Sequence, residues 1–314
     1  MENFIYSVNA TFPIFLVIVI GYVLKQIGML NDEFVSVANK FNFKVTLPFL
    51  VFRDISSANI REDFDVVFVL FCAIATTICF FTIWGGAKLL IKDKTIVGAF
   101  VQASFRSSAA VMGIAFIQNI YGTSGMAPLM IIGSVPLYNI YSVIVLTLEA
   151  ENSGQGKEKI KKALIGIVTN PIIIGILLGV AVSVSGISFP VIATKTIQQI
   201  AVLATPLALL GLGAGFEGKK ALAKIKPTLF ASFIKLILQP ALFLPLAISL
   251  GFTEEKLVGI LIMLGAPTTV SCYIMAKNTG HEGVLTSSVV VATTFLSSVT
   301  FTFWLFILKA NGYI

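Results

Sequence analysis

Long apolar segments separated by short polar stretches fill this chain. A helix needs roughly 20 mostly apolar residues to cross the hydrocarbon core of a bilayer. Ten segments come near or above that length, at 4–25, 34–55, 66–91, 95–120, 125–148, 163–185, 190–216, 227–250, 254–277 and 284–308. A membrane-spanning strand needs only about 9–11 residues of alternating pattern, so segments of this length favour helices. The pattern predicts an all-α polytopic membrane protein with ten transmembrane helices.

Composition supports this reading and excludes several others. The chain is 57% hydrophobic and 12% charged, and its mean hydropathy is +0.95. The net charge of +7 comes mainly from lysines that flank the apolar segments, so it does not indicate nucleic acid. The first segment follows a start without basic residues and is too long for the core of a signal peptide, so we expect it to be the first span. Three cysteines lie in apolar segments without a CxxC pair, and we expect no disulfide.

The lysines sort by side when the loops alternate across a membrane. One side receives Lys25, Lys88, Lys92, Lys94, Lys157, Lys159, Lys161, Lys162, Lys219, Lys220, Lys224, Lys226 and Lys277. The other side receives Arg53, Arg61, Lys195, Lys256 and Lys309. The positive-inside rule makes the first side cytoplasmic. We therefore expect a multi-pass protein of the cell (inner) membrane with both termini outside and a cytoplasmic linker at 150–162.

Prolines and glycines recur between the two halves at nearly constant spacing. At a spacing of 158 residues the pairs are Pro13 with Pro171, Gly21 with Gly179, Gly28 with Gly186, and Pro48 with Pro206. At 161 residues they are Gly98 with Gly259 and Gly122 with Gly283. Because each half has an odd number of helices, the halves enter the membrane in opposite directions. This predicts two inverted five-helix repeats, an architecture common among secondary transporters.

Such folds bind substrate where corresponding helices are broken near the membrane midplane, and helices 4 and 9 are the candidates. The 161-residue spacing places Arg106 opposite Pro267 and Ser107-Ser108 opposite Thr268-Thr269. Proline removes a backbone donor and breaks a helix, and the free amides of a half-helix then carry partial positive charge. Arginine adds a full charge and a fork that matches a carboxylate.

Three basic residues lie within apolar segments, Lys44, Arg106 and Lys235, and we expect no acidic residue among them. A charge at membrane depth costs a few kcal/mol or more and usually faces a functional interior. An excess of embedded positive charge predicts an anionic ligand and argues against a carboxylate proton relay. Structural roles stay open: Arg106 could bind backbone carbonyls, Lys44 and Lys235 could extend to the interface, and Pro48 and Pro206 could only kink their helices.

These residues resemble the auxin efflux carrier family, including its bacterial malate- or malonate-permease-like members, over the whole chain. The resemblance is carried by Asn39-Lys40-Phe41 and Leu47-Pro48, by Phe105-Arg106-Ser107-Ser108 with Gly113-Ile114, and by Ala266-Pro267-Thr268-Thr269 with Tyr273 and Ala276. Two positions depart from the family pattern: Ser108 stands where asparagine is usual, and Ala115 stands where proline is usual.

The resemblance implies crossing broken helices 4 and 9 in a fold like that of bile-acid symporters and sodium/proton antiporters. It implies scaffold helices at 1–57 and 163–220, moving core helices at 58–149 and 221–314, elevator-type alternating access and a homodimer. It implies substrate binding by Arg106, Ser107, Ser108, Pro267, Thr268, Thr269, Asn39, Lys44 and Tyr273. Gly113, Pro48 and Pro206 are the expected hinges or helix breaks.

We therefore expect a secondary transporter of small organic anions, with a carboxylate and the lipid bilayer as partners. We expect no enzyme activity, cofactor, metal ion or nucleic acid. Gly213–Gly218 fits a dinucleotide motif, but no strand precedes it. Ser124 and His281, a protease-like pair, are predicted at opposite membrane faces. The alternatives are a sodium-coupled organic-anion symporter of the bile-acid type and, outside transport, a membrane sensor.

Overall fold

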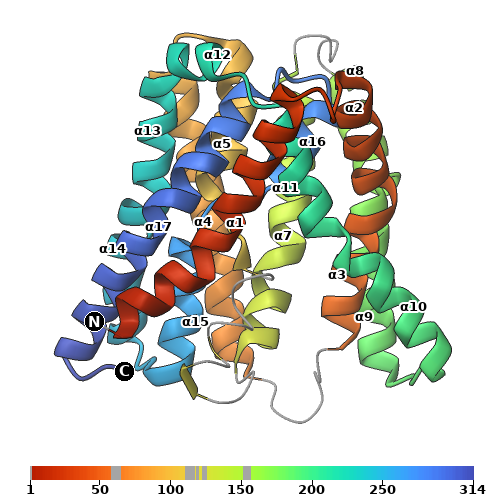
Figure 1. The fold of residues 1–314 in the computed structure, drawn as a ribbon. Coiled ribbons are helices and arrows are strands. Elements are labelled where there is room, and N and C mark those ends of the chain that lie inside the picture. Colours follow the sequence, from red (N-terminus) through yellow and green to blue (C-terminus); the bar gives the residue numbers. More distant parts are fainter. Residues whose placement is uncertain (1, 58–64, 110–116, 118–119, 122–125, 151–156) are drawn as a thin grey trace.

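The computed structural model is a bundle of helices, and its described residues contain no strand (Figure 1). It describes the chain except for residues 1, 58–64, 110–116, 118–119, 122–125 and 151–156. Both chain ends lie at one end of the bundle, and α12 lies at the other (Figure 1). The two termini therefore share a side, as the lysine pattern predicts.

The first half contains α1 (Glu2–Gln26), α2 (Asp32–Phe41), α3 (Leu47–Ser56), α4 (Val66–Leu90), α5 (Val97–Phe105) and α7 (Ala127–Leu148). The second half contains α8 (Lys157–Val168), α9 (Pro171–Ser185), α10 (Val191–Val202), α11 (Ala204–Ala214), α12 (Gly218–Ala223), α13 (Ile225–Phe233), α14 (Gln239–Ser249), α15 (Glu254–Gly265), α16 (Ser271–Asn278) and α17 (Val284–Ala310). A 3₁₀ turn, η2 (Lys94–Ile96), precedes α5. Two π-helical turns, η1 (Asn42–Thr46) and η3 (Ile234–Leu238), join α2 to α3 and α13 to α14.

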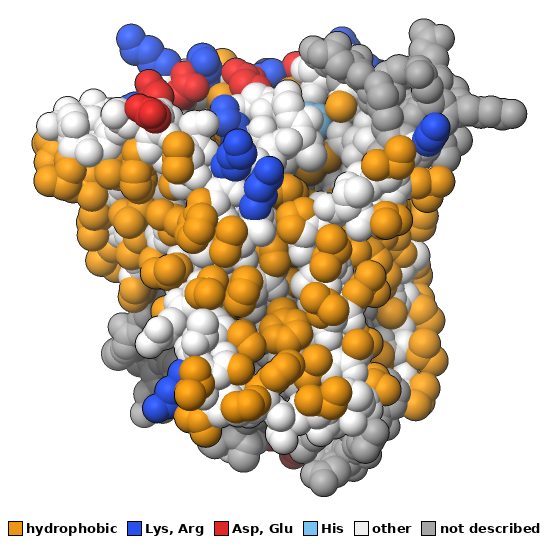
Figure 2. Space-filling model, turned by 90° about the vertical axis from the view of Figure 1, so that its right-hand side faces the viewer, with side chains coloured by type: hydrophobic (Ala, Val, Ile, Leu, Met, Phe, Trp, Pro, Cys, Tyr) orange, Lys and Arg blue, Asp and Glu red, His pale blue; other side chains and the backbone are white. Residues whose placement is uncertain are grey.

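Five stretches are long and apolar enough to cross a membrane: Val66–Leu90, Ala127–Leu148, Val191–Ala214, Ile225–Ser249 and Val284–Ala310. Shorter apolar helices cover Phe12–Gln26 and Pro171–Ser185. Hydrophobic side chains cover most of the middle of the face shown in Figure 2, and most of the charged side chains on that face gather above them. This distribution is that of a protein whose middle faces lipid, while the count of ten spans stays a prediction.

Three prolines each follow a disturbed helical turn. A proline lacks an N–H and its ring crowds the carbonyl four residues earlier. Pro48 and Pro240 lie two residues after the π-helical segments η1 and η3, and Pro206 lies one turn after the end of α10 at Val202. Helix 2 therefore continues past Pro48 through a π-turn, and the interruption near Pro206 is confined to Leu203. Gly113, the third expected hinge, lies outside the described residues.

Helices from the two halves pack closely through glycine. A Cβ added at Gly21 of α1 would lie 2.9 Å from the Cα of Leu210 in α11, and one at Gly175 of α9 would lie 3.1 Å from the Cα of Pro48 in α3. Neither position has room for a larger side chain. Helix α1 thus makes direct backbone contact with α11, and α3 with α9, while the division into scaffold and core stays a prediction.

The predicted linker at 150–162 is partly helical. Residues 151–156 lie outside the described residues, and α8 begins at Lys157. The second half therefore begins with a helix that is strongly basic in its first turns.

Candidate functional site

Two broken helices meet inside the bundle. Helix α5 ends at Phe105, and Arg106 adopts an extended conformation with φ −81° and ψ 135°. Helix α15 ends at Gly265, and α16 begins at Ser271. The amide of Ser108 donates a hydrogen bond to the carbonyl of Pro267 at 2.9 Å. The two interruptions expected from sequence are therefore present and in direct contact.

The last carbonyls of α5 are satisfied by side chains from the second half. Helix ends leave carbonyls without intrahelical partners, and in a membrane interior each one needs a donor. Thr268 Oγ1 donates to the Ala103 carbonyl at 2.7 Å. Gln239 Nε2, from the start of α14, donates to the Ser104 carbonyl at 2.6 Å. The end of α5 is thus fixed by residues distant in sequence.

The last carbonyls of α15 are satisfied in a reciprocal way. Ser107 Oγ donates to the Ile262 carbonyl at 3.1 Å, and the Tyr138 hydroxyl donates to the Met263 carbonyl at 2.9 Å. Lys235 Nζ donates to the Leu264 carbonyl at 2.6 Å. A cation at the negative end of a half-helix is electrostatically favourable. Lys235, fully buried in η3, therefore does not extend to the interface and caps α15 instead.

Arg106 is held by the neighbouring helix α7. Its guanidinium donates to Asn139 Oδ1 at 2.7 Å and to Ser142 Oγ at 3.4 Å, and Met275 of α16 lies against it. Asn139 and Ser142 are oriented in turn by hydrogen bonds to carbonyls of α7. Arg106 is 5% exposed, and no carboxylate among the described residues forms an ion pair with it. The side chain is a buried, oriented and uncompensated cation.

A cavity of about 70 Å³ lies beside this arginine. Its lining includes Arg106, Ser107, Ser108, Pro267, Thr268 and Thr269, so six of the predicted binding residues are brought together. Thr269, Val270 and Ser271 also line it, and no described residue accepts a hydrogen bond from their backbone amides. Free amides at the start of α16 carry partial positive charge. The cavity therefore combines one full cation with several unused hydrogen-bond donors.

The other predicted binding residues lie elsewhere. Lys44 is exposed and lines neither this cavity nor the next one. Asn39 and Tyr273 line a separate cavity of about 560 Å³ at the lysine-rich end of the bundle, together with Lys25, Lys40 and Lys277. Asn39 is buried there, and its Oδ1 has no hydrogen-bond partner among the described residues.

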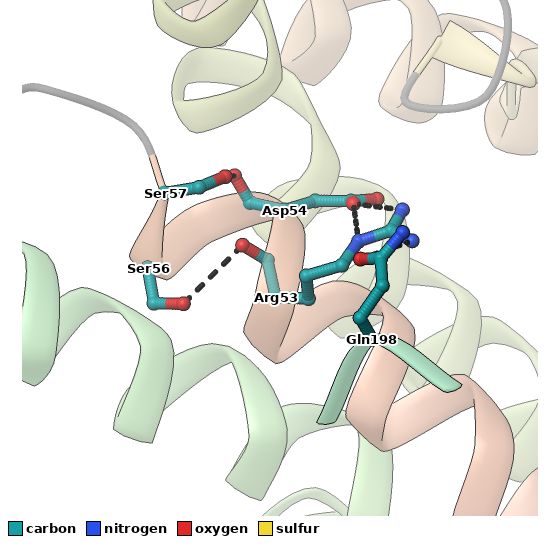
Figure 3. A network of polar contacts seen from close by, with 5 residues as sticks. All are labelled: Arg53, Asp54, Ser56, Ser57 and Gln198. Carbon is teal, nitrogen blue, oxygen red and sulfur yellow. Dashed lines mark hydrogen bonds and ion pairs between the residues drawn. The ribbon is translucent and has the colours of Figure 1, made fainter. Parts of the chain in front are cut away.

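Asp54 corrects the expectation that no acidic residue lies within the apolar segments. It is 7% exposed in α3 and lines the cavity that contains Arg106. The guanidinium of Arg53 folds onto its carboxylate, with Nε and Nη2 at 2.9 and 2.5 Å from Oδ1 (Figure 3). Arg53 also donates to Gln198 of α10 at 3.3 Å. The cavity thus contains a carboxylate, and the argument against a carboxylate proton relay loses its premise.

Sequence reasoning also missed the side chains that hold the broken helices. Tyr138, Asn139 and Ser142 follow the i, i+1 and i+4 positions of one helix face, and Gln239 follows Lys235 by four residues. A search for polar residues at helical spacing within the apolar segments could have found both groups. Asp54 was overlooked because a charged Arg-Asp pair near the end of a span resembles ordinary interfacial residues.

Comparisons with known proteins identify the family of this chain. Residues 6–305 match the family described as "Membrane transport protein". A protein of Methanothermobacter thermautotrophicus named "Uncharacterized transporter" is 22% identical over 304 residues, which are 96% of this chain and 98% of that protein. A protein of Rhizobium meliloti named "Putative malonate transporter" is 24% identical over 309 residues, which are 96% and 95% of the two chains. The chain belongs to the membrane transport protein family, the family of the auxin efflux carriers.

Proposed function

We propose that this protein is a secondary transporter that carries small organic anions, carboxylates in particular, by elevator-type alternating access. The observation that carries the proposal is the cavity at the crossing of the two broken helices, which is lined by Arg106 and by three residues whose backbone amides have no acceptor among the described residues. Charge-assisted hydrogen bonds from arginine and amides suit a carboxylate. The name of the Rhizobium meliloti relative points to a substrate of the same class.

The position of the cavity supports the elevator mechanism. Its lining comes partly from α1, α3, α9 and α11, through Ile14, Leu50, Ile172 and Leu209. The rest comes from the broken helices and from α7 and α17. A ligand here lies between the predicted scaffold and the predicted moving core. The reciprocal contacts of Ser107 with α15 and Thr268 with α5 are those expected of inverted repeats, and we propose a homodimer by family resemblance.

The sodium-coupled alternative finds less support at this site. Sodium, like other hard cations, needs several oxygen ligands. The carbonyls of Ala103, Ser104, Ile262, Met263 and Leu264 at the two half-helix ends already accept hydrogen bonds from side chains. Arg106 and the free amides of Thr269, Val270 and Ser271 are donors at the crossing, and donors favour an anion.

A thermal-shift screen tests the proposed function. Purified protein is heated with malonate, malate, succinate, lactate or acetate, with sodium replaced by choline, and in parallel with sodium chloride. A ligand present at a hundred times its Kd adds about 2.7 kcal/mol of apparent stability. We expect at least one acid to raise Tm by several degrees in the absence of sodium. Stabilisation by sodium and by none of the acids would favour the symporter alternative and contradict the proposal.

Pro267→Ala is expected to impair transport without unfolding the protein. The alanine restores an N–H and removes the ring that prevents helical continuation, so the segment between Gly265 and Ser271 can become helical and its free amides can be consumed. Uptake in proteoliposomes should fall about tenfold or more, with size-exclusion behaviour unchanged. Pro245→Ala, in the interior of α14 and away from the cavity, is the matched control. Normal uptake by Pro267→Ala would remove this break from the mechanism.

The orientation of the protein is tested by thiol labelling in intact cells. The native cysteines Cys72, Cys79 and Cys272 are buried and free, so the background should be low. Lys92→Cys, in the exposed turn after α4, should resist a membrane-impermeant maleimide until the cells are opened. Asn311→Cys, exposed near the C-terminus, should react in intact cells. The reverse pattern would place the termini in the cytoplasm.

A further inference from the structure

The cavity at the crossing of the broken helices is lined by charged side chains of both signs. Arg106 contributes a positive charge from the core side, and Asp54 contributes a carboxylate from α3. Arg53 compensates the charge of Asp54 through an ion pair. Arg106 has no such partner among the described residues, so Asp54, Arg106 and Arg53, which lies just outside the lining, together carry a net charge of about one positive unit. A ligand with a single negative charge would therefore leave the buried site neutral, whereas a dianion would leave it negative.

The elements packed around Asp54 supply no further charge to the cavity. Helices α7 and α9 contain no charged residue along their lengths. Lys195 on α10 and Lys44 in η1 are exposed, and neither lines the cavity. Asp54, Arg53 and Arg106 are thus the charged groups that set the local balance within the described part of the chain.

The Asp54 carboxylate has an unused acceptor. Both hydrogen bonds from Arg53 reach Oδ1 (Figure 3). Oδ2 has no donor among the described residues, although the side chain is 7% exposed and lines the cavity. A carboxylate oxygen that lines a cavity can accept a hydrogen bond from a ligand bound there. A donor on the bound ligand would supply the hydrogen bond that the described residues do not.

We propose that the site selects a monoanion that carries a hydrogen-bond donor at the end opposite its carboxylate. This inference rests on the proposed function. The ligand carboxylate lies against Arg106 and the free amides of Thr269, Val270 and Ser271, and the donor faces Asp54. Three classes of compound fit: short hydroxy acids, amide acids, and dicarboxylic acids in their singly protonated form, such as hydrogen malonate. The cavity volume of about 70 Å³ suits a small ligand.

Two malonate derivatives separate the donor from charge and size. Malonamate and monomethyl malonate each carry one carboxylate at neutral pH, and they are similar in length. The amide end of malonamate donates hydrogen bonds, whereas the ester end of monomethyl malonate cannot. Calorimetry on the full-length wild-type protein at pH 7 should show at least tenfold tighter binding of malonamate. Asp54→Asn should reduce this preference to less than threefold, because Arg53 then holds the amide oxygen and the group in place of Oδ2 becomes an NH₂ donor.

Asp65→Asn is the matched control, since it makes the same chemical change outside the cavity, where Asp65 pairs with Lys256. It should keep the preference for malonamate. Equal affinity of the wild-type protein for the two compounds would overturn the inference and leave the proposed function standing. The inference would also fall if folded Asp54→Asn protein kept the full preference. If neither derivative nor malonate, lactate or acetate bound the wild-type protein, both proposals would fall. The wild-type comparison decides the matter even if Asp54→Asn does not fold.

Discussion

Arg106→Ala is expected to weaken the binding of a small carboxylate by tens-fold or more while the protein stays folded. Truncating one partner of a buried, hydrogen-bonded charge pair costs about 2–5 kcal/mol. Arg106 has no carboxylate partner among the described residues, so its removal leaves no buried acid unpaired, and Asn139 and Ser142 keep hydrogen bonds within α7. The expected loss therefore falls on the ligand rather than on the fold. Isothermal calorimetry with malonate or the best acid of the thermal-shift screen measures it.

Two further variants sharpen this result. Arg106→Lys should recover only part of the affinity, because an ammonium cannot reproduce the planar fork of the guanidinium. Lys44→Ala is the matched control, since Lys44 was also predicted to be an embedded cation but is exposed and outside the cavity. It should bind like the wild type. Unchanged affinity in folded Arg106→Ala protein would remove Arg106 from the site.

Lys235→Ala is expected to cause the largest loss of stability among single substitutions at the crossing. The change leaves the Leu264 carbonyl without a donor, weakens the contacts to Met263, and empties the space of a fully buried side chain. Unpaired buried acceptors cost about 1–3 kcal/mol and large-to-small core changes about 2–5 kcal/mol, so the total should be on the order of 3–6 kcal/mol. Thermal unfolding of the purified protein in detergent should show a Tm lower by many degrees or little folded protein.

Lys235→Met distinguishes the stability that comes from packing of the lysine stem from the stability that comes from its hydrogen bonds to the end of α15. Methionine fills most of the volume of the lysine stem but offers no donor to α15. Its Tm should lie between those of the wild type and Lys235→Ala. Lys309→Ala, at an exposed position near the end of α17, controls for the loss of a lysine elsewhere. Wild-type stability of Lys235→Met would show that the hydrogen bonds to α15 contribute nothing, which would contradict the capping role.

The helical class and the crossing could be predicted because each follows from a strong local rule. Apolar segments of spanning length indicate membrane helices, and a single charge among them marks an interior position. Pro267 predicted the break after α15. The 161-residue repeat spacing then predicted a corresponding break in the first half at Arg106. The structure places both breaks at these positions and joins them through Ser108 and the Pro267 carbonyl.

The other features of the site could not be predicted from sequence, because they depend on how helices pack and on the direction in which each side chain points. Lys44 and Arg106 look alike in sequence, but Lys44 faces outward from η1 while Arg106 faces α7. Pro48 was expected to break or kink its helix, and the backbone instead relieves the proline through a π-turn that keeps the helix continuous. Asp54 enters the cavity through tertiary packing of α3, which no local pattern shows. Asn39 and Tyr273 carry the family resemblance but line the larger cavity at the lysine-rich end.

Uptake into proteoliposomes tests the central claim most directly. Vesicles containing the purified protein are loaded with unlabelled malonate, diluted into trace labelled malonate, and compared with vesicles containing Arg106→Ala protein and with protein-free vesicles. We expect accumulation of label with the wild-type protein, competition by other short carboxylates, and rates near those of empty vesicles for Arg106→Ala. Wild-type uptake no faster than in protein-free vesicles, for malonate and for each acid of the screen, would contradict organic-anion transport.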